Sequence, residues 1–197
     1  MSSFLKVLER DIDFYSKRVY NINVNFSERM MKMSITLIGM PSCGKSTLGV
    51  LLAKKLGYRF IDSDLLIQER ENALLHQIIS EKGNGEFLRI ENDVNCSITD
   101  TRAVISTGGS AVYGEQAMKH LASLGEVVYL RISLDTMLAR LGDYSHRGVV
   151  LPEGYTLANM YEERSALYMR YATAVIDIDK EDINTNLEKI YLLAEKG

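Results

Sequence analysis

From residue 34 onward, short apolar runs alternate regularly with longer segments of helical periodicity. The apolar runs are nearly continuous, which is typical of strands in a parallel sheet that helices cover on both faces. This succession predicts an α/β fold, a three-layer sandwich around a five-stranded parallel sheet flanked by helices. We expect strands at 34–39, 58–62, 103–107, 126–131 and 174–178, and helices at 45–56, 64–80, 84–99, 114–124, 133–141, 156–172 and 182–195.

The first 33 residues depart from this pattern and are predicted to form an N-terminal extension to a single domain at 34–197. Apolar side chains recur at helical spacing in residues 1–20, which is typical of an amphipathic helix. Residues 21–26 alternate between polar and apolar side chains and are expected to be extended. A chain of 197 residues, 46% of them hydrophobic, suits one core. We expect a monomer, or a dimer formed through the extension.

The charge balance favours a small-molecule partner. The formal net charge is -3 and no long run of like charges occurs, so nothing predicts a nucleic-acid or membrane partner. Cys43 and Cys96 are the two cysteines, and we interpret both as reduced thiols. Because no apolar stretch approaches the length of a membrane span and no secretory signal layout begins the chain, we expect a cytoplasmic protein.

The stretch "GMPSCGKST", residues 39–47, lies between the first predicted strand and the first predicted helix. Gly39 and Gly44 permit close approach of the backbone, so that successive N–H groups can surround phosphate oxygens. Lys45 can bridge the outer phosphates, and the Ser46 hydroxyl can bind Mg²⁺. This pattern predicts a site for ATP with Mg²⁺. The expected nucleotide-binding residues of the loop are Gly39, Pro41, Ser42, Cys43, Gly44, Lys45, Ser46 and Thr47.

Two carboxylates follow the second predicted strand in "FIDSD". They are Asp62 and Asp64, and they are expected at the carboxyl edge of the sheet, where ligands of open parallel sheets bind. One can hold the water shell of a metal while the other meets an incoming hydroxyl group. An aspartate after a strand is also a common helix cap, which is the alternative interpretation of Asp64.

Together with "STGGSAV", "VVYL", "ARLGDYSHRG" and "EERSALYMRYA", these motifs resemble the shikimate kinase family over residues 34–179. The resemblance implies a P-loop kinase fold with a mobile lid. It implies ATP-dependent phosphorylation of a hydroxyl on a small acid, most simply shikimate to shikimate 3-phosphate. By resemblance, Lys45 and Asp64 are catalytic, Asp62 serves the magnesium site with Ser46, and Asp64 also contacts the hydroxyls of the substrate.

The same resemblance assigns roles to three arginines and two glycines. Arg140 is expected against the adenine, and Arg147 is expected to reach the phosphates from the lid as a catalytic group. Arg164 is expected to bind the carboxylate of the substrate, since the planar guanidinium makes two parallel charge-assisted hydrogen bonds to such a group. Gly108 and Gly109 end the third predicted strand, and their lack of side chains leaves room for the substrate.

Some positions that are expected to contact the substrate depart from the family pattern. The family carries arginine directly after a phenylalanine and a glutamate three residues after that arginine, whereas "GEFLRIEN" has Leu88 in the place of the arginine and Arg89 one residue later. Moving one position along a helix turns a side chain by about 100 degrees around the helix axis. Despite this rotation, Arg89 is expected to bind the substrate. The third glycine of the family is Ser110, and the lid reads "RGV".

Two further interpretations therefore stay open beside shikimate phosphorylation. One is the same chemistry on another small hydroxyl compound, homoserine-like or gluconate-like; gluconate is less favoured because "DSD" ends the second strand. The other is a nucleotide-binding regulatory protein without turnover, which the N-terminal extension favours.

Overall fold

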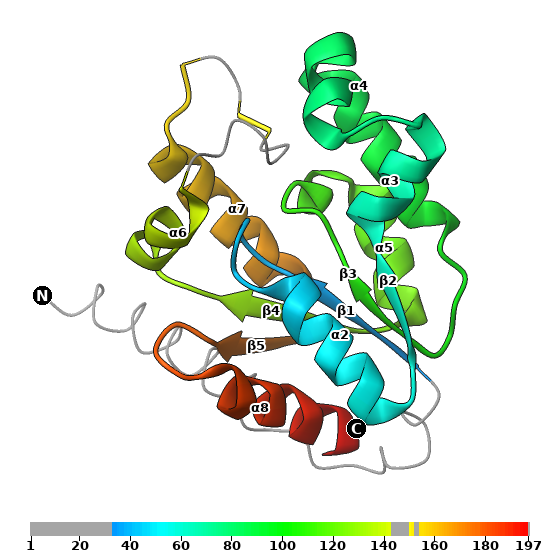
Figure 1. The fold of residues 1–197 in the computed structure, drawn as a ribbon, viewed down its shortest axis with the longest axis vertical. Helices are drawn as coiled ribbons and strands as arrows, with labels where there is room; N and C mark the ends of the chain where they lie inside the picture. Colours follow the sequence, from blue (N-terminus) through cyan, green and yellow to red (C-terminus); the bar gives the residue numbers. More distant parts are fainter. Residues whose placement is uncertain (1–32, 143–149, 152–153, 197) are drawn as a thin grey trace, which may run out of the picture.

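The computed structural model describes residues 33–142, 150–151 and 154–196. The expected helix at 1–20, the extended segment at 21–26 and Arg147 lie outside these ranges, so the predicted extension and the lid arginine stay predictions. The described part is built around a five-stranded, all-parallel sheet (Figure 1).

All five predicted strands are present, in the order β2-β3-β1-β4-β5. Every residue of the central strand β1 is buried, as its unbroken apolar run predicts for a strand covered on both faces. Thr36 of β1 is paired with Ile105 on one side and Val127 on the other. The strands are β1 Ser34–Ile38, β2 Arg59–Asp62, β3 Ala103–Ser106, β4 Gly125–Arg131 and β5 Ala174–Asp177.

Helices cover both faces of the sheet and complete the predicted three-layer P-loop kinase fold (Figure 1). On one face α2 packs against β1, β2 and β3 and against α8, which also packs on β5. On the other face α5 packs against β1 and β4, and α7 packs against β4. The helices are α2 Lys45–Leu56, α3 Ser63–Glu71, α4 Leu75–Ser97, α5 Glu115–Leu124, α6 Leu134–Leu141, α7 Leu157–Tyr171 and α8 Ile183–Lys196, with a short 3-10 helix, η2, at Ala111–Tyr113.

The helices after β2 divide differently from the expectation. A helix was expected at 64–80 and another at 84–99, but α3 ends at Glu71 and α4 runs from Leu75 to Ser97. Asn72 adopts the left-handed conformation, with φ 50°, and its N–H caps the end of α3. Gly83, at φ 78°, produces only a kink inside α4. The asparagine and not the glycine therefore ends the first helix, and apolar periodicity alone did not distinguish them.

The strand order creates a crevice at one edge of the sheet. Strand β1 lies between β3 and β4, so the chain leaves β1 toward one side and returns to the other. Ligands of open parallel sheets bind at the carboxyl ends of strands at such a switch point. Among the helices in the described ranges, none is sufficiently long and apolar to cross a membrane.

Candidate active site

A cavity of about 520 Å³ lies at the carboxyl edge of the sheet, within the size range of small-molecule sites. The loops after β1 and β3 and the first turn of α2 supply most of its wall. Helix α4 supplies two side chains, and α3, α6 and α7 supply one each. Its lining residues are Pro41, Ser42, Gly44, Lys45, Ser46, Thr47, Asp64, Leu75, Phe87, Thr107, Gly108, Gly109, Ser110, Arg140 and Arg164.

The loop after β1 has the backbone that a phosphate cradle requires. A Cβ on Gly39 would lie 2.6 Å from the carbonyl oxygen of Leu130, so only glycine fits there. Gly44 has φ 103° and is the N-cap of α2, which places the positive end of that helix at the loop. Lys45 begins α2, and its buried Nζ donates hydrogen bonds of 2.9 Å to the carbonyl oxygens of Gly39 and Met40.

Three oxygen atoms meet beside this loop. The Ser46 hydroxyl donates to Oδ2 of Asp62 at 2.7 Å and lies 3.2 Å from the Ser106 hydroxyl. Oδ1 of Asp62 accepts from the backbone N–H of Asp64, so the carboxylate also caps α3 and is fixed in place. One carboxylate and two hydroxyls form a hard-oxygen donor set, which suits Mg²⁺ that is otherwise held by water and phosphate oxygens. Ser106 was missed in the sequence because its neighbours in space are distant along the chain.

Asp64 occupies the first turn of α3 and lines the cavity. Burial, and to a smaller extent the nearby charge of Asp62, raise the pKa of its carboxyl group to about 6, while Lys45 acts in the opposite direction. A carboxylate whose pKa lies near the pH of the solution is well suited to accept a proton from a hydroxyl group. Asp62 and not Asp64 makes the side-chain cap of α3, so the alternative interpretation of Asp64 as a cap is wrong.

The buried guanidinium of Arg164 also lines the cavity. It is 1% exposed; Nη2 donates to the carbonyl oxygen of Val150 at 2.8 Å, and Nε to the Tyr113 hydroxyl at 3.4 Å. Nη1 lies 3.2 Å from the position that a Cβ on Gly109 would take. These contacts hold the planar group at the wall that Gly109 leaves open, so a substrate carboxylate can approach Nη1.

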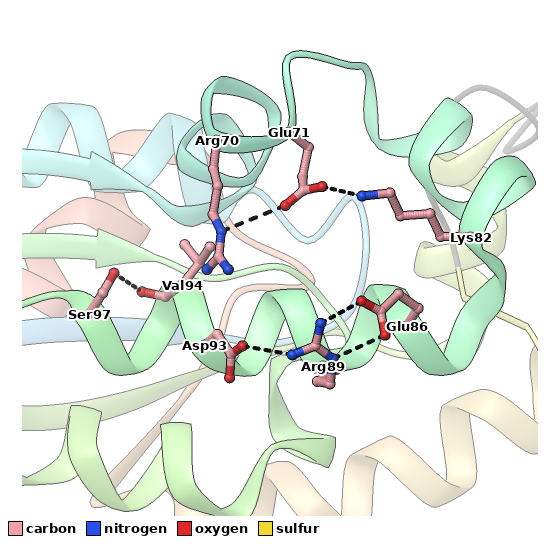
Figure 2. A network of polar contacts seen from close by, with 8 residues as sticks. All are labelled: Arg70, Glu71, Lys82, Glu86, Arg89, Asp93, Val94 and Ser97. Carbon is pink, nitrogen blue, oxygen red and sulfur yellow. Dashed lines mark hydrogen bonds and ion pairs between the residues drawn. The ribbon is translucent and has the colours of Figure 1, made fainter.

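Arg89 does not reach the cavity, contrary to the expectation for substrate binding. Its side chain is 62% exposed and pairs with Glu86 and Asp93 along the outer face of α4 (Figure 2). The rotation of about 100 degrees per residue therefore turns this arginine to solvent. Phe87, two residues earlier, lines the cavity instead. Leu88 is half-buried and packs against the apolar cluster around Phe87.

The structure brings most of the predicted residues together. Arg140, from the end of α6, lines the cavity with the loop residues, Asp64, Gly108, Gly109 and Arg164. Gly39, Cys43 and Asp62 stand directly behind the lining. Sequence reasoning missed Leu75, Phe87 and Thr107, and also Glu91, a carboxylate buried on the apolar face of α4. A charged residue within an apolar helical face was the signal that could have identified Glu91.

Comparison with known proteins decides the family. A family model described as shikimate kinase matches residues 41–193, which is more than three quarters of the chain. The chain belongs to the shikimate kinase family. Members of this family are ATP-dependent kinases that phosphorylate an alcohol group, so the recognition made from the motifs is confirmed.

Individual shikimate kinases match over nearly their whole length. The shikimate kinase of Sulfurihydrogenibium sp. (strain YO3AOP1) is 33% identical over 158 residues, which cover 80% of this chain and 95% of that relative. The shikimate kinase of Mycobacterium avium (strain 104) is 37% identical over 157 residues, covering 77% and 88%. The structure of shikimate kinase from Acinetobacter baumannii in complex with shikimate superposes with a TM-score of 0.74 at 28% identity, covering 85% of this chain and 96% of that one.

The position of Arg89 leads to a first prediction. Arg89→Ala is expected to leave the KM for the phosphoryl acceptor within about twofold of the wild-type value, because exposed ion pairs along a helix contribute only tenths of a kcal/mol. Steady-state kinetics with a saturating nucleotide measure this. A KM raised tenfold or more would show that Arg89 turns into the site during catalysis.

Proposed function

We propose that this shikimate kinase family member catalyses ATP-dependent phosphorylation of shikimate to shikimate 3-phosphate. One observation carries the proposal: a single cavity joins the phosphate loop with Lys45, the carboxylate of Asp64 and the guanidinium of Arg164. A cradle for a triphosphate, a base for a hydroxyl group and a cation for a carboxylate are the three parts that phosphorylation of a hydroxy acid needs.

The nucleotide half of the site stabilises the transferring phosphoryl group. The backbone N–H groups of the loop and the N-terminus of α2 surround the phosphates, and Lys45 adds a positive charge to the oxygens that gain charge during transfer. Mg²⁺, held by Ser46 and Asp62 with Ser106 nearby, would neutralise further phosphate charge. Arg140 is exposed at the rim of the cavity, where it is available to the adenine.

The acceptor half orients a hydroxyl group for in-line attack. Asp64 accepts the proton as the hydroxyl oxygen attacks the terminal phosphorus. Gly109 leaves the wall open, and the Tyr168 hydroxyl donates to the Gly109 carbonyl at 2.6 Å, which fixes that backbone. Arg164 binds the carboxylate and thereby sets the orientation of the ring, while Phe87 and Leu75 provide an apolar surface for its carbon face.

A panel of acceptors tests this proposal. Consumption of ATP coupled to product detection is measured with shikimate, homoserine, gluconate and related hydroxyl compounds. Turnover with shikimate at a kcat/KM at least a hundredfold above the others supports the proposal. Preferred turnover of another acceptor assigns the same chemistry to a different substrate, and no turnover with any acceptor favours a nucleotide-binding regulatory role.

Arg164→Lys should raise the KM for shikimate by roughly tenfold to a hundredfold, because lysine keeps the charge but loses the planar pair of donors. The Kd for ATP should stay unchanged, since Arg164 lies in the acceptor half of the site. Arg170→Lys is the matched control, as an exposed arginine of the same helix. Isothermal titration with ATP and steady-state kinetics with shikimate separate the two effects, and an unchanged KM for shikimate would remove Arg164 from the acceptor site.

We also infer a reducing, cytoplasmic environment. Both Cys43 and Cys96 are free thiols. Cys43 is buried in the phosphate loop with Sγ 3.8 Å from Nζ of Lys45, so a reduced thiol at this position preserves the geometry of the loop.

A further inference from the structure

The carboxyl group of Glu91 is buried beside the acceptor half of the cavity. The residue is 1% exposed, and its Oε2 accepts a hydrogen bond of 2.6 Å from the Ser110 hydroxyl, which itself lines the cavity. Oε1 is buried too and has no hydrogen-bond partner in the described part of the chain. A buried carboxylate oxygen without a partner is costly, whereas a protonated oxygen at the same place is not ionised and can donate.

The unpartnered oxygen of Glu91 lies close to the carboxylate of Asp64. A Cβ added to Gly108 would lie 2.2 Å from Oε1 of Glu91 and 2.7 Å from Oδ1 of Asp64. Both oxygens therefore crowd the same point and lie within about 5 Å of each other. Two carboxylates so close in a buried place disfavour simultaneous ionisation. Gly108 is thus required to leave space for this pair as well as for a ligand.

Few positive charges are near enough to compensate an ionised Glu91. Within the described residues, no salt bridge joins Glu91 to a cation. The groups that face it are Asp64 from α3, Arg164 and Tyr168 from α7, Lys45 from α2, and the Ser110 hydroxyl.

Each of the two cations is already engaged by backbone carbonyls. Arg164 binds the Val150 carbonyl, and Lys45 binds two carbonyls of the phosphate loop. On α5, Glu115 and Lys119 pair with each other in solvent. Burial and, to a smaller extent, the charge of Asp64 raise the pKa of Glu91 to about 8, against the opposing effects of the Ser110 hydrogen bond, Arg164 and Lys45.

We propose that Glu91 is a positioning residue that carries a proton on Oε1 while an acidic acceptor is bound, so that Arg164 presents an uncompensated positive charge to the carboxylate of the acceptor. This inference rests on the proposed function. A neutral Glu91 holds Ser110 through Oε2 and donates from Oε1 toward Asp64. An ionised Glu91 adds a second negative charge beside Gly108, next to the wall where the carboxylate of the substrate binds.

The proposal predicts a specific pH dependence of acceptor binding. The KM for shikimate in the wild-type protein should rise about tenfold for each pH unit above about pH 8, as Glu91 ionises. Glu91→Gln imitates the protonated acid, with a carbonyl oxygen for Ser110 and an N–H donor toward Asp64. This variant should keep a KM close to the wild-type value at neutral pH and lose the rise at high pH.

Two matched controls isolate the charge of Glu91. Glu86→Gln, on the solvent side of the same helix, should keep the wild-type pH profile. Methyl shikimate lacks the carboxylate charge, so its KM in the wild-type protein should not rise above about pH 8. An identical rise of the KM for shikimate in the wild type and in Glu91→Gln overturns the proposal, as does an equal rise for the methyl ester.

A second variant, and a measurement that needs no substrate, test the proposal even if Glu91→Gln does not fold. Ser110→Ala removes a hydrogen bond that lowers the pKa of Glu91, so the rise of KM should move to higher pH. A raised pKa in the folded state also means that the folded protein loses stability as pH rises toward that value. The Tm of the wild type should therefore fall more between about pH 5 and about pH 9 than the Tm of Glu91→Gln. Parallel Tm curves contradict the proposal.

These measurements also separate the two proposals. If no shikimate is phosphorylated at any pH, the proposed function fails, while the Tm curves still decide whether Glu91 is protonated. If shikimate is phosphorylated and the pH profile of KM is unaffected by Glu91→Gln, the proposed function stands and the role of Glu91 is rejected.

Discussion

Lys45→Ala is expected to lower kcat by about a thousandfold or more, which corresponds to about 4 kcal/mol of lost transition-state stabilisation. The Nζ of Lys45 lies in the wall of the cavity and donates to carbonyl oxygens at both Gly39 and Met40, so it is held at the centre of the phosphate loop. During phosphoryl transfer the terminal phosphate oxygens and the leaving oxygen require this positive charge. The loss should therefore appear mainly in kcat, with a smaller loss of ATP affinity.

A matched lysine distinguishes the charge at the loop from a general effect on the helix. Lys54→Ala removes an exposed lysine in the last turn of the same helix, α2, and should keep kcat within about twofold. Single-turnover kinetics with Mg²⁺–ATP and shikimate measure the chemical step, and thermal melts confirm that both variants are folded. A near-normal turnover rate in Lys45→Ala would contradict the role of Lys45 and the phosphate loop in phosphoryl transfer.

The sheet and the phosphate loop were predictable because their signals are local. Each strand lies in a short, mainly apolar run, and the five runs marked the five strands. The inner strands β1, β3 and β4 are almost entirely buried, whereas the edge strands β2 and β5 are only partly buried. The loop is defined by the spacing of Gly39, Gly44 and Lys45 within a few residues, and it folds as that spacing predicts. The end of α3 was predicted wrongly because Asn72 can take the left-handed conformation, a property that hydrophobic periodicity does not register.

The acceptor half of the site was less predictable because its contacts connect distant parts of the chain. Glu91 and Ser110 are separated by 19 residues and meet only because α4 packs against the segment after β3. The direction of Arg89 likewise depends on how α4 is rotated, and Phe87 rather than Arg89 faces inward. The sequence alone showed that Leu88 replaces the arginine of the family pattern. It did not show which neighbouring residue lines the cavity instead.

The two carboxyl groups of the acceptor site, those of Asp64 and Glu91, differ in their protonation at neutral pH. Asp64, with a pKa near 6, is ionised at neutral pH and can receive a proton. Glu91, with a pKa near 8, is neutral at the same pH and keeps its proton. Because their pKa values lie on opposite sides of neutrality, in the proposed mechanism Asp64 serves as the base while Glu91 leaves the charge of Arg164 available to an acidic substrate.

Asp64→Asn is expected to lower kcat by about a hundredfold to a ten-thousandfold while the Kd for ATP stays within about twofold. Asparagine is nearly the same size and keeps hydrogen bonds to the hydroxyls of the acceptor, but it cannot take a proton. The wild-type kcat should also fall about tenfold for each pH unit below about pH 6, because burial and the charge of Asp62 raise the pKa of Asp64 and only its ionised form is a base. In Asp64→Asn this acid limb should be absent.

Rapid-quench measurements of phosphoryl transfer across this pH range, with calorimetry for ATP, test both parts of the Asp64 prediction. Asp93→Asn, which changes an exposed aspartate on α4, is the control and should retain both the rate and the acid limb. The decisive comparison is between the rate of phosphoryl transfer and the Kd for ATP in Asp64→Asn. A variant of Asp64 that transfers phosphate normally but no longer binds ATP would reverse the assignment, because it would place this carboxylate at the metal–nucleotide half of the cavity rather than beside the hydroxyl group that attacks.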